Sequence, residues 1–173
     1  GIGPVLDHPV RTREDIAALP QLTDESLAPI REAIGLVTAE LGDTPLIGFA
    51  GAPFTVASYL VEGRPDTAHP HTHQLMHDDP VAWQALMDWV ADIDIAFLRA
   101  QVLAGASAVQ LFDSWVGELG LDDYLTLVQP ASGKVLRALG ELGVPRIHFG
   151  TGSAHLLVSM RDAGADVMSV AAD

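Results

Sequence analysis

Several side chains that could take part in chemistry follow a short apolar run in the middle of the chain. The stretch FDSWVGELG places Asp113, Ser114 and Trp115 on consecutive positions just after that run. A serine in such a turn could be a nucleophile, but the nucleophile-elbow pattern requires glycine two residues to each side. Phe112 and Val116 occupy those positions. We therefore interpret Ser114 as a hydrogen-bond donor to an acceptor group or as a helix cap.

Aromatic residues recur where predicted strands give way to loops. Phe49, Phe112 and Phe149 each lie in the last positions of an apolar run. In one interpretation each phenylalanine closes the core beneath its loop. In the other, Phe49 and Phe112 form an apolar floor for a flat or aromatic ligand. Both interpretations remain open on the residues alone.

A turn with two glycines occurs in the stretch HFGTGSAHL. Backbone N–H groups of such a turn can receive an anion at a helix N-terminus. The dinucleotide-binding pattern fails because His155 stands where its third glycine would be. We expect an ordinary turn followed by a helix that Ser153 caps.

Four histidines gather in RPDTAHPHTHQLMHDDP, which we expect to be a polar connector. They are His69, His71, His73 and His77. On a helix, His73 and His77 would share one face. Histidines in a polar loop are more often adventitious than metal ligands, so we predict that this cluster binds no metal. A zinc site is the alternative.

The elements that must position these residues alternate between helix and strand. The first 20 residues show no sustained period and predict a loop. Apolar spacing, cap residues, proline and glycine then predict helices over 24–41, 53–62, 80–104, 121–143 (split at Pro130) and 153–163, and strands over 44–51, 107–113, 144–150 and 165–173. Thr23 or Asp24 caps the first helix, and Pro29 could mark its true first turn.

This alternation predicts a parallel sheet with crossover helices. A flavodoxin-like open sheet fits 173 residues, whereas the eight units of a (β/α)8 barrel need about 250. The pattern alone therefore favours the open sheet, with part of a barrel as the alternative. In both folds the chemistry belongs at the C-terminal ends of the strands.

Composition excludes several classes of protein. The net charge of −14, with Lys134 as the single lysine, argues against a nucleic-acid partner. Without cysteine there are no disulfides and no cysteine nucleophile. No apolar run approaches the roughly 20 residues of a membrane span, and no signal peptide is evident. We expect a cytoplasmic protein without a membrane partner.

The segment GFAGAPFTVASYLVEG, residues 48–63, resembles the signature segment of the uroporphyrinogen decarboxylase family. Further blocks agree with the family in the same order: GIGPVLDHPVRT, AQVLAGASAVQLFDSWVGEL, VPRIHFGTG and MRDAGADVMSV. The resemblance covers essentially the whole chain. It implies a (β/α)8 TIM barrel of which the chain holds about four strand–helix units.

The resemblance also implies an activity. Family members act as homodimers without metal or organic cofactor, and they remove four acetate carboxyl groups from uroporphyrinogen III to give coproporphyrinogen III. Carried over by position, Tyr59 would be catalytic, beside the reacting acetate. Ser114 would hydrogen-bond a substrate carboxylate, and Phe49 and Phe112 would pack against the macrocycle.

Other parts of the family pattern are absent from this sequence. The arginine-rich N-terminal motif, a later aspartate and a C-terminal histidine segment are missing, and the fourth strand ends in Ala171-Ala172-Asp173 instead of an aspartate–tryptophan pair. Residues 1–173 therefore look like the central part of one domain, inactive alone. Alternatives are a corrinoid- or thiol-handling methyltransferase relative and a non-catalytic tetrapyrrole-binding paralogue.

Overall fold

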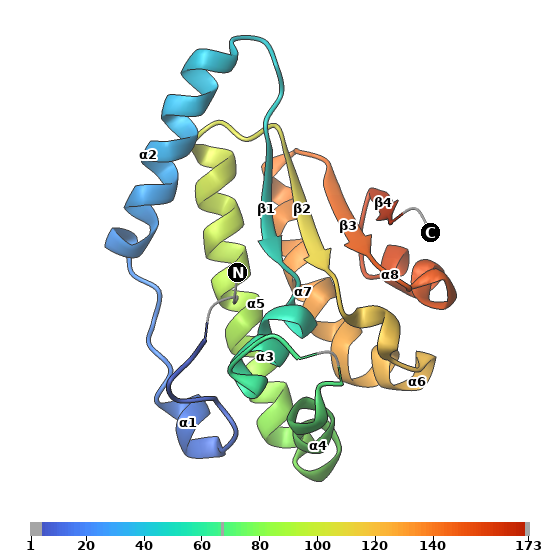
Figure 1. Cartoon of the computed structure of the whole chain (residues 1–173). Helices are drawn as coiled ribbons and strands as arrows, with labels where there is room; N and C mark the ends of the chain where they lie inside the picture. Colours follow the sequence, from blue (N-terminus) through green and yellow to red (C-terminus); the bar gives the residue numbers. More distant parts are fainter. Residues whose placement is uncertain (1–4, 67, 172–173) are drawn as a thin grey trace.

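Four parallel strands alternate with helices along the chain (Figure 1). The structure is a computed structural model that describes residues 5–66 and 68–171. The strands are β1 (Ile47–Gly51), β2 (Ala108–Asp113), β3 (Arg146–Gly150) and β4 (Val167–Val170). The α-helices are α1 (Arg13–Ala17), α2 (Asp24–Leu41), α3 (Pro53–Glu62), α4 (Pro70–Asp78), α5 (Pro80–Leu103), α6 (Leu121–Asp123), α7 (Gln129–Leu139) and α8 (Leu157–Asp162). Short 3-10 turns are η1 (Val116–Glu118), η3 (Gly140–Leu142) and η4 (Ala154–Leu156), and η2 (Tyr124–Val128) is a π-helical turn.

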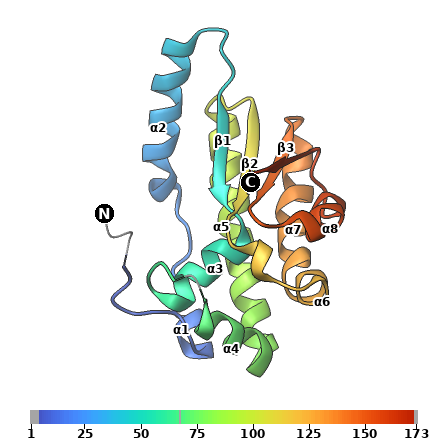
Figure 2. The same cartoon turned by 45° about the vertical axis from the view of Figure 1, so that its right-hand side comes forward.

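The strands lie in the sheet in chain order, β1-β2-β3-β4, and every neighbouring pair is parallel. The turned view in Figure 2 shows β1 beside β2 and β2 beside β3. A flavodoxin-like sheet reverses its strand order at a switch point, and this sheet does not. The open sheet that the pattern favoured is therefore wrong, and the alternative, part of a (β/α)8 barrel, is confirmed. The argument from length failed because it assumed that one chain holds every unit of the fold.

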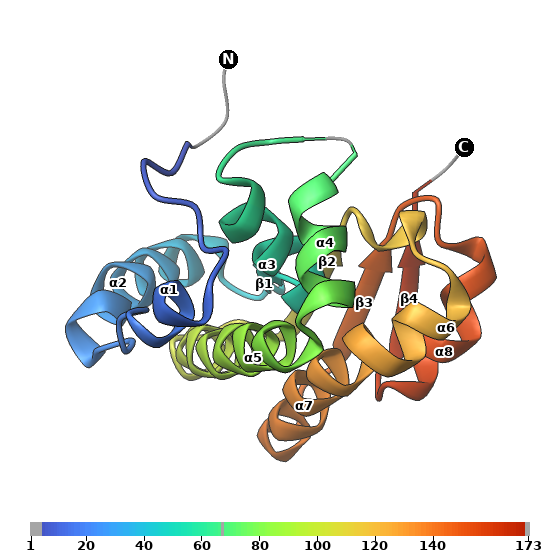
Figure 3. The same cartoon turned by 90° about the horizontal axis from the view of Figure 1, so that it is seen from below.

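Because every crossover runs the same way, the helices collect on one face of the sheet. Figure 3 shows α5 and α7 lying together along that side, where they pack on each other and α5 also packs on β1 and β2. Ala50, Val109 and Leu111 point to the helices and are buried. Phe49, on the alternate positions of β1, is 59% exposed. The sheet therefore has one covered apolar face and one apolar face open to solvent.

Most predicted elements are confirmed, with their caps. Thr23 caps α2 by accepting a hydrogen bond from the Ser26 N–H. Pro53 begins α3, and Gly63 ends it in the left-handed conformation with φ 75°, which favours glycine. Gly105 follows α5 with φ 124°. The predicted helix over 121–143 is split before Pro130, which lies in the first turn of α7.

Four local predictions are wrong or incomplete. The opening loop contains α1, which Thr12 and Asp15 close with a capping box. Pro29 lies inside α2 and does not mark its first turn. The polar connector contains α4, because Pro70 starts a helix whose Leu75 and Met76 reach the core. The fourth strand is shorter than expected, and the end of its predicted range at 172–173 lies outside the described residues.

The open edge of β1 is completed by a side chain. The Ala52 N–H donates to the Phe112 carbonyl, so the backbone groups of Ala52 point toward β2. Along a strand, the backbone groups of successive residues point to opposite edges. The N–H and C=O of Phe49 therefore point to the edge of β1 that faces away from β2. Gln101 of α5 bonds both of them. Its carboxamide oxygen accepts from the Phe49 N–H at 3.0 Å, and its NH₂ donates to the Phe49 carbonyl at 2.9 Å. Gln101 therefore stands in for a neighbouring strand at this position.

Within the described ranges, no helix has the length and apolar character needed to cross a membrane.

Substituting Gln101→Met tests this edge contact. Methionine keeps the volume but removes both hydrogen bonds from a buried site, so the free energy of unfolding should fall by about 1–3 kcal/mol. Denaturant unfolding of the protein carrying this chain measures the change. Gln110→Met is the matched control, because Gln110 lies on the partly exposed face of β2 and should shift stability by no more than about 0.5 kcal/mol. Equal losses in the two variants would contradict the role assigned to Gln101.

Candidate functional site

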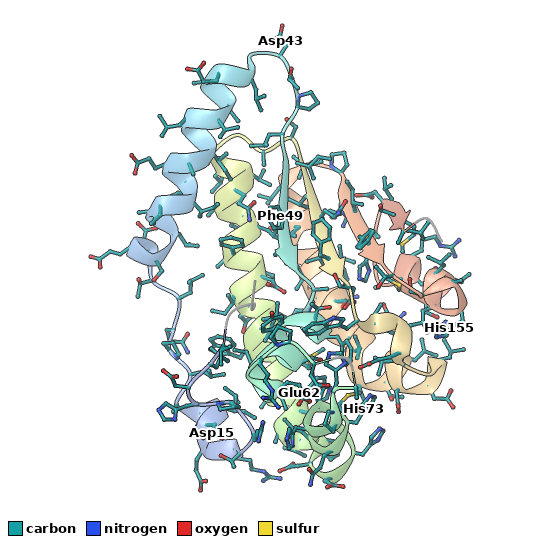
Figure 4. All side chains as sticks on the ribbon, in the orientation of Figure 1. Asp15, Asp43, Phe49, Glu62, His73 and His155 are labelled. Atoms are coloured by element: carbon teal, nitrogen blue, oxygen red, sulfur yellow. The ribbon has the colours of Figure 1, made fainter. Side chains whose placement is uncertain are left out.

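An aromatic row crosses the open face of the sheet at the C-terminal ends of the strands. Phe112 and Phe149 are register partners on β2 and β3, and their rings lie 5.3 Å apart. Phe49 of β1, labelled in Figure 4, meets the Phe112 ring edge-on at 5.5 Å. Phe49 is exposed within the described residues and points away from the helices, toward the side that a complete (β/α)8 barrel encloses. The row therefore lies on the inner face of the barrel, and its role as an apolar floor for a ligand stays a prediction.

Tyr59 and Ser114 are brought together through Trp115. Tyr59 lies on α3, and its ring stacks on the Trp115 indole at 5.1 Å with an interplanar angle of 14°. Ser114 is the residue before Trp115, directly after β2. The structure thus places Phe49, Tyr59, Phe112 and Ser114 at one end of the sheet. It gives no direct contact between the Tyr59 and Ser114 side chains.

Ser114 borders a hollow of about 290 Å³ between the loops that follow β2 and β3. The lining residues are His69, Ser114, Trp115, Gly117, Glu118, Thr151 and Gly152. The Thr151 hydroxyl donates to the Ser114 carbonyl and ties the two loops together. Ser114 is not a helix cap, since η1 begins after Trp115 and has no side-chain cap. Of the two interpretations offered for Ser114, hydrogen-bond donation remains.

Glycine allows the two loops to approach backbone to backbone. A Cβ on Gly117 would collide with the Thr151 carbonyl and would lie 2.7 Å from the Gly152 carbonyl carbon. Gly152 itself has φ 59°. Ser153 follows, but its side chain makes no cap hydrogen bond, so the predicted cap of the next helix is wrong. Gly117 therefore allows the close packing of the two loops, and Gly152 allows the left-handed backbone in the turn after β3.

Two histidines of the cluster share one carboxylate, and a third contacts another. His69 is buried and contacts Glu118, His73 contacts the other oxygen of Glu118 at 3.5 Å, and His77 lies 3.4 Å from Asp123. His71 is exposed. Among residues 5–66 and 68–171, no three such side chains converge in a way that could hold a metal ion.

The comparisons with known proteins decide the family. The family description "Uroporphyrinogen decarboxylase (URO-D)" matches residues 1–173. The chain belongs to the uroporphyrinogen decarboxylase family. It is 62% identical over 170 residues to a uroporphyrinogen decarboxylase of Arthrobacter sp. and 59% identical to one of Streptomyces avermitilis. The resemblance found in the sequence is confirmed.

The chain spans about half the length of the uroporphyrinogen decarboxylases it matches, 49% and 48% for these two, while 98% of the chain is covered. A methyltransferase from Methanosarcina mazei has a similar structure, with a TM-score of 0.75 over 96% of this chain and 47% of its own. At 20% identity that likeness shows the fold alone. The α/β fold of TIM-barrel type, with four of its strand–helix units present, is confirmed.

Behind the site, this decarboxylase-family chain buries a polar cluster, of which the sequence pointed to Asp113 alone. Asp113 is 0% exposed, accepts a hydrogen bond from the Thr55 hydroxyl at 3.1 Å and lies 3.2 Å from the equally buried His148 Nε2. Burial, and then the charge of Asp113, raise the pKa of Asp94 well above its usual range. Burial likewise raises the pKa of Tyr124. Asp94 is therefore a neutral acid over part of the pH range in which a solvated aspartate is charged.

His69 and Trp115, which the sequence analysis named separately, meet beside the site. His69 and Trp115 have rings 4.4 Å apart although 46 positions separate them in sequence, and Arg64 and Trp115 border one hollow of about 550 Å³. Only Trp115, beside Ser114, carried a signal that could have revealed it. The polar residues at alternate strand positions, Asp113 and His148, could also have been recognised as facing the helices.

Asp94→Asn should stabilise the protein at neutral pH and not at acid pH. The raised pKa means that the folded state holds a proton which the unfolded chain releases above about pH 4. Folding is therefore increasingly opposed as the pH rises, and asparagine removes that opposition. Each pKa unit of upward shift corresponds to about 1.4 kcal/mol of stability that the substitution restores at neutral pH.

Melting curves of the protein carrying this chain at pH 4 and pH 7.5 measure the difference between Asp94→Asn and wild type. The matched control is Asp92→Asn on the same helix, where the exposed Asp92 pairs with Lys134 at 2.7 Å. This surface pair should change stability by at most about 1 kcal/mol. A gain at Asp94 that is equal at both pH values would contradict the assigned cause.

Proposed function

We propose that the protein carrying this chain decarboxylates the four acetate side chains of uroporphyrinogen III to give coproporphyrinogen III in haem biosynthesis. The observation that carries the proposal is the family match along the whole chain, together with a consistent arrangement of its expected site residues. Phe49, Tyr59, Phe112 and Ser114 lie at the C-terminal end of the sheet, where (β/α)8 enzymes hold their substrates.

The geometry suits a large, flat and anionic substrate. The exposed Phe49 ring and the adjacent Phe112 ring offer apolar area to a macrocycle. In the proposed reaction a pyrrole ring takes up a proton and becomes an electron sink. The acetate C–C bond then breaks and carbon dioxide leaves. A proton adds to the remaining carbon to form a methyl group, and the ring releases the proton it had taken up, so that one proton is consumed per carboxyl group. Tyr59 is proposed to act beside the reacting acetate and Ser114 to hydrogen-bond a substrate carboxylate.

The chain itself is proposed to be the central part of the catalytic domain. Its relatives are about twice as long, and the cationic groups that many substrate carboxylates need are sparse here, since Arg64 is the basic residue near Trp115. We therefore assign the remaining substrate contacts to parts of the domain outside residues 1–173. A homodimer in the cytoplasm, without metal or organic cofactor, is part of this proposal.

The methyltransferase alternative gains no specific support. The similarity to the Methanosarcina mazei protein rests on 20% identity and concerns the arrangement of strands and helices. The curated relatives at 53–62% identity carry the decarboxylase name. Decarboxylation is therefore the function we propose.

Tyr59→Phe in the complete protein should slow the first decarboxylation while the fold survives. The substitution keeps the ring that stacks on Trp115 and removes only the hydroxyl. Loss of one positioned hydrogen-bonding group in an active site lowers kcat on the order of 10²-fold. Stopped assays that separate the partly decarboxylated porphyrins measure the first step.

The control is Tyr124→Phe, which alters the other tyrosine of the chain. The Tyr124 hydroxyl is buried and has no hydrogen-bond partner within the described residues, so its removal should leave turnover unchanged. Normal turnover by Tyr59→Phe would refute the role proposed for Tyr59.

The isolated 173-residue chain should not convert uroporphyrinogen, because the arginine, aspartate and histidine segments of the family pattern are absent from it. Chromatography of the oxidised products measures this, with the complete protein at equal concentration as the positive control. Coproporphyrinogen formed by a chain of verified mass would refute the prediction.

A further inference from the structure

His69 combines a strained backbone with a buried side chain. It adopts the left-handed conformation, φ 44° and ψ 47°, and it is the one non-glycine residue with positive φ in the described part of the chain. Its side chain is 1% exposed, although it belongs to the segment between two helices. A left-handed non-glycine residue costs free energy and persists only where surrounding contacts impose it. The contacts of His69 therefore impose the left-handed conformation on the segment between α3 and α4.

The first contact is with Glu118 of η1. The His69 Nδ1 lies 2.8 Å from Glu118 Oε2, and because a carboxylate only accepts, Nδ1–H is the donor. His73, one turn into α4, lies 3.5 Å from the other Glu118 oxygen. One carboxylate thus fixes the beginning of α4 against the loop that follows β2.

A second set of contacts fixes the same segment to α3. The buried Glu62, at the end of α3, accepts from the Thr72 N–H at 2.8 Å and from the Thr72 hydroxyl at 3.0 Å. Figure 4 shows Glu62 and His73 at the same end of the molecule. The beginning of α4 is therefore bound both to the helix that carries Tyr59 and to the loop that carries Trp115.

The third contact is aromatic. The His69 ring lies 4.4 Å from the Trp115 indole, tilted by 46°, and the same indole stacks nearly parallel on Tyr59 at 5.1 Å. The His69 Nε2 is buried and has no partner among residues 5–66 and 68–171. His69 therefore packs on Trp115 as a flat ring whose orientation is set by the hydrogen bond to Glu118. The other ring nitrogen, Nε2, is buried.

We propose that His69 is a positioning residue: held by Glu118, it fixes the plane of Trp115, and Trp115 in turn fixes the plane of Tyr59. This inference deepens the proposed function and rests on it, since it concerns how the hydroxyl of Tyr59 is aimed at the reacting acetate. His69 itself takes no part in proton transfer.

The test uses His69→Asn in the complete protein. Asparagine tolerates the left-handed conformation and can donate to Glu118, so it keeps the backbone and the hydrogen bond but removes the ring. The near-ultraviolet circular dichroism signal of Trp115 is obtained as the difference between wild type and Trp115→Phe. That signal should be largely lost in His69→Asn. His71→Asn, an exposed histidine two positions on, is the matched control and should keep it.

Kinetics provide the second measurement. His69→Asn should lower kcat by about 10-fold or more with KM nearly unchanged, because a small misplacement of a catalytic group can cost up to about 100-fold. In the Tyr59→Phe background the same substitution should change kcat by less than about 2-fold, because residues that act through one another are not additive. A purely structural role would lower kcat in both backgrounds alike.

The outcomes separate the two proposals. An unchanged Trp115 signal in His69→Asn, or equal factors in the two backgrounds, would overturn the positioning role. An equal effect of His71→Asn would do so as well. If wild-type protein does not decarboxylate uroporphyrinogen, the proposed function fails, while the spectroscopic comparison still tests the link from His69 to Trp115.

Discussion

The Asp113 carboxylate is the constraint on which the rest of the site depends. It is fully buried at the end of β2, and a buried polar group must be hydrogen-bonded to offset the loss of its water contacts. Thr55 reaches it from α3 and His148 reaches it from β3. The helix that carries Tyr59 and the strands β2 and β3, which carry Phe112 and Phe149, are thus held to one carboxylate beneath the open face. Loss of Thr55 or His148 would leave a buried carboxylate oxygen without its hydrogen bond.

The helices and strands could be predicted from local sequence because capping residues, prolines and glycines mark their ends. Pro53 and Gly63 bound α3, and Gly105 follows α5, as expected. The order of the strands could not be predicted in this way, because helix–strand alternation is the same in an open sheet and in a barrel. That choice depends on the direction of each crossover, which no local pattern records. α4 was missed because its polar, histidine-rich exposed side concealed the buried Leu75 and Met76.

The candidate site was predictable only where its residues follow strands directly. Ser114 directly follows β2, Phe49 and Phe112 lie near the ends of their strands, and Tyr59 lies on α3, which only Ala52 separates from β1. His69 does not follow a strand, and its contact with Trp115 is made by a segment folding back across the strand ends. The expected roles of the site residues come from the family resemblance, whereas the contacts that hold these residues in place come from the structure. Each kind of information therefore reached residues that the other did not.

Gln101 has a consequence for association between chains. An uncovered sheet edge is a template on which a foreign strand can pair and start aggregation. By bonding both backbone groups of Phe49, Gln101 occupies the middle of β1. A strand that adds along the whole edge must first displace the carboxamide, whereas a short segment could pair at either end. The same holds for the preceding strand of a closed barrel, which would have to displace Gln101 in order to pair with Phe49.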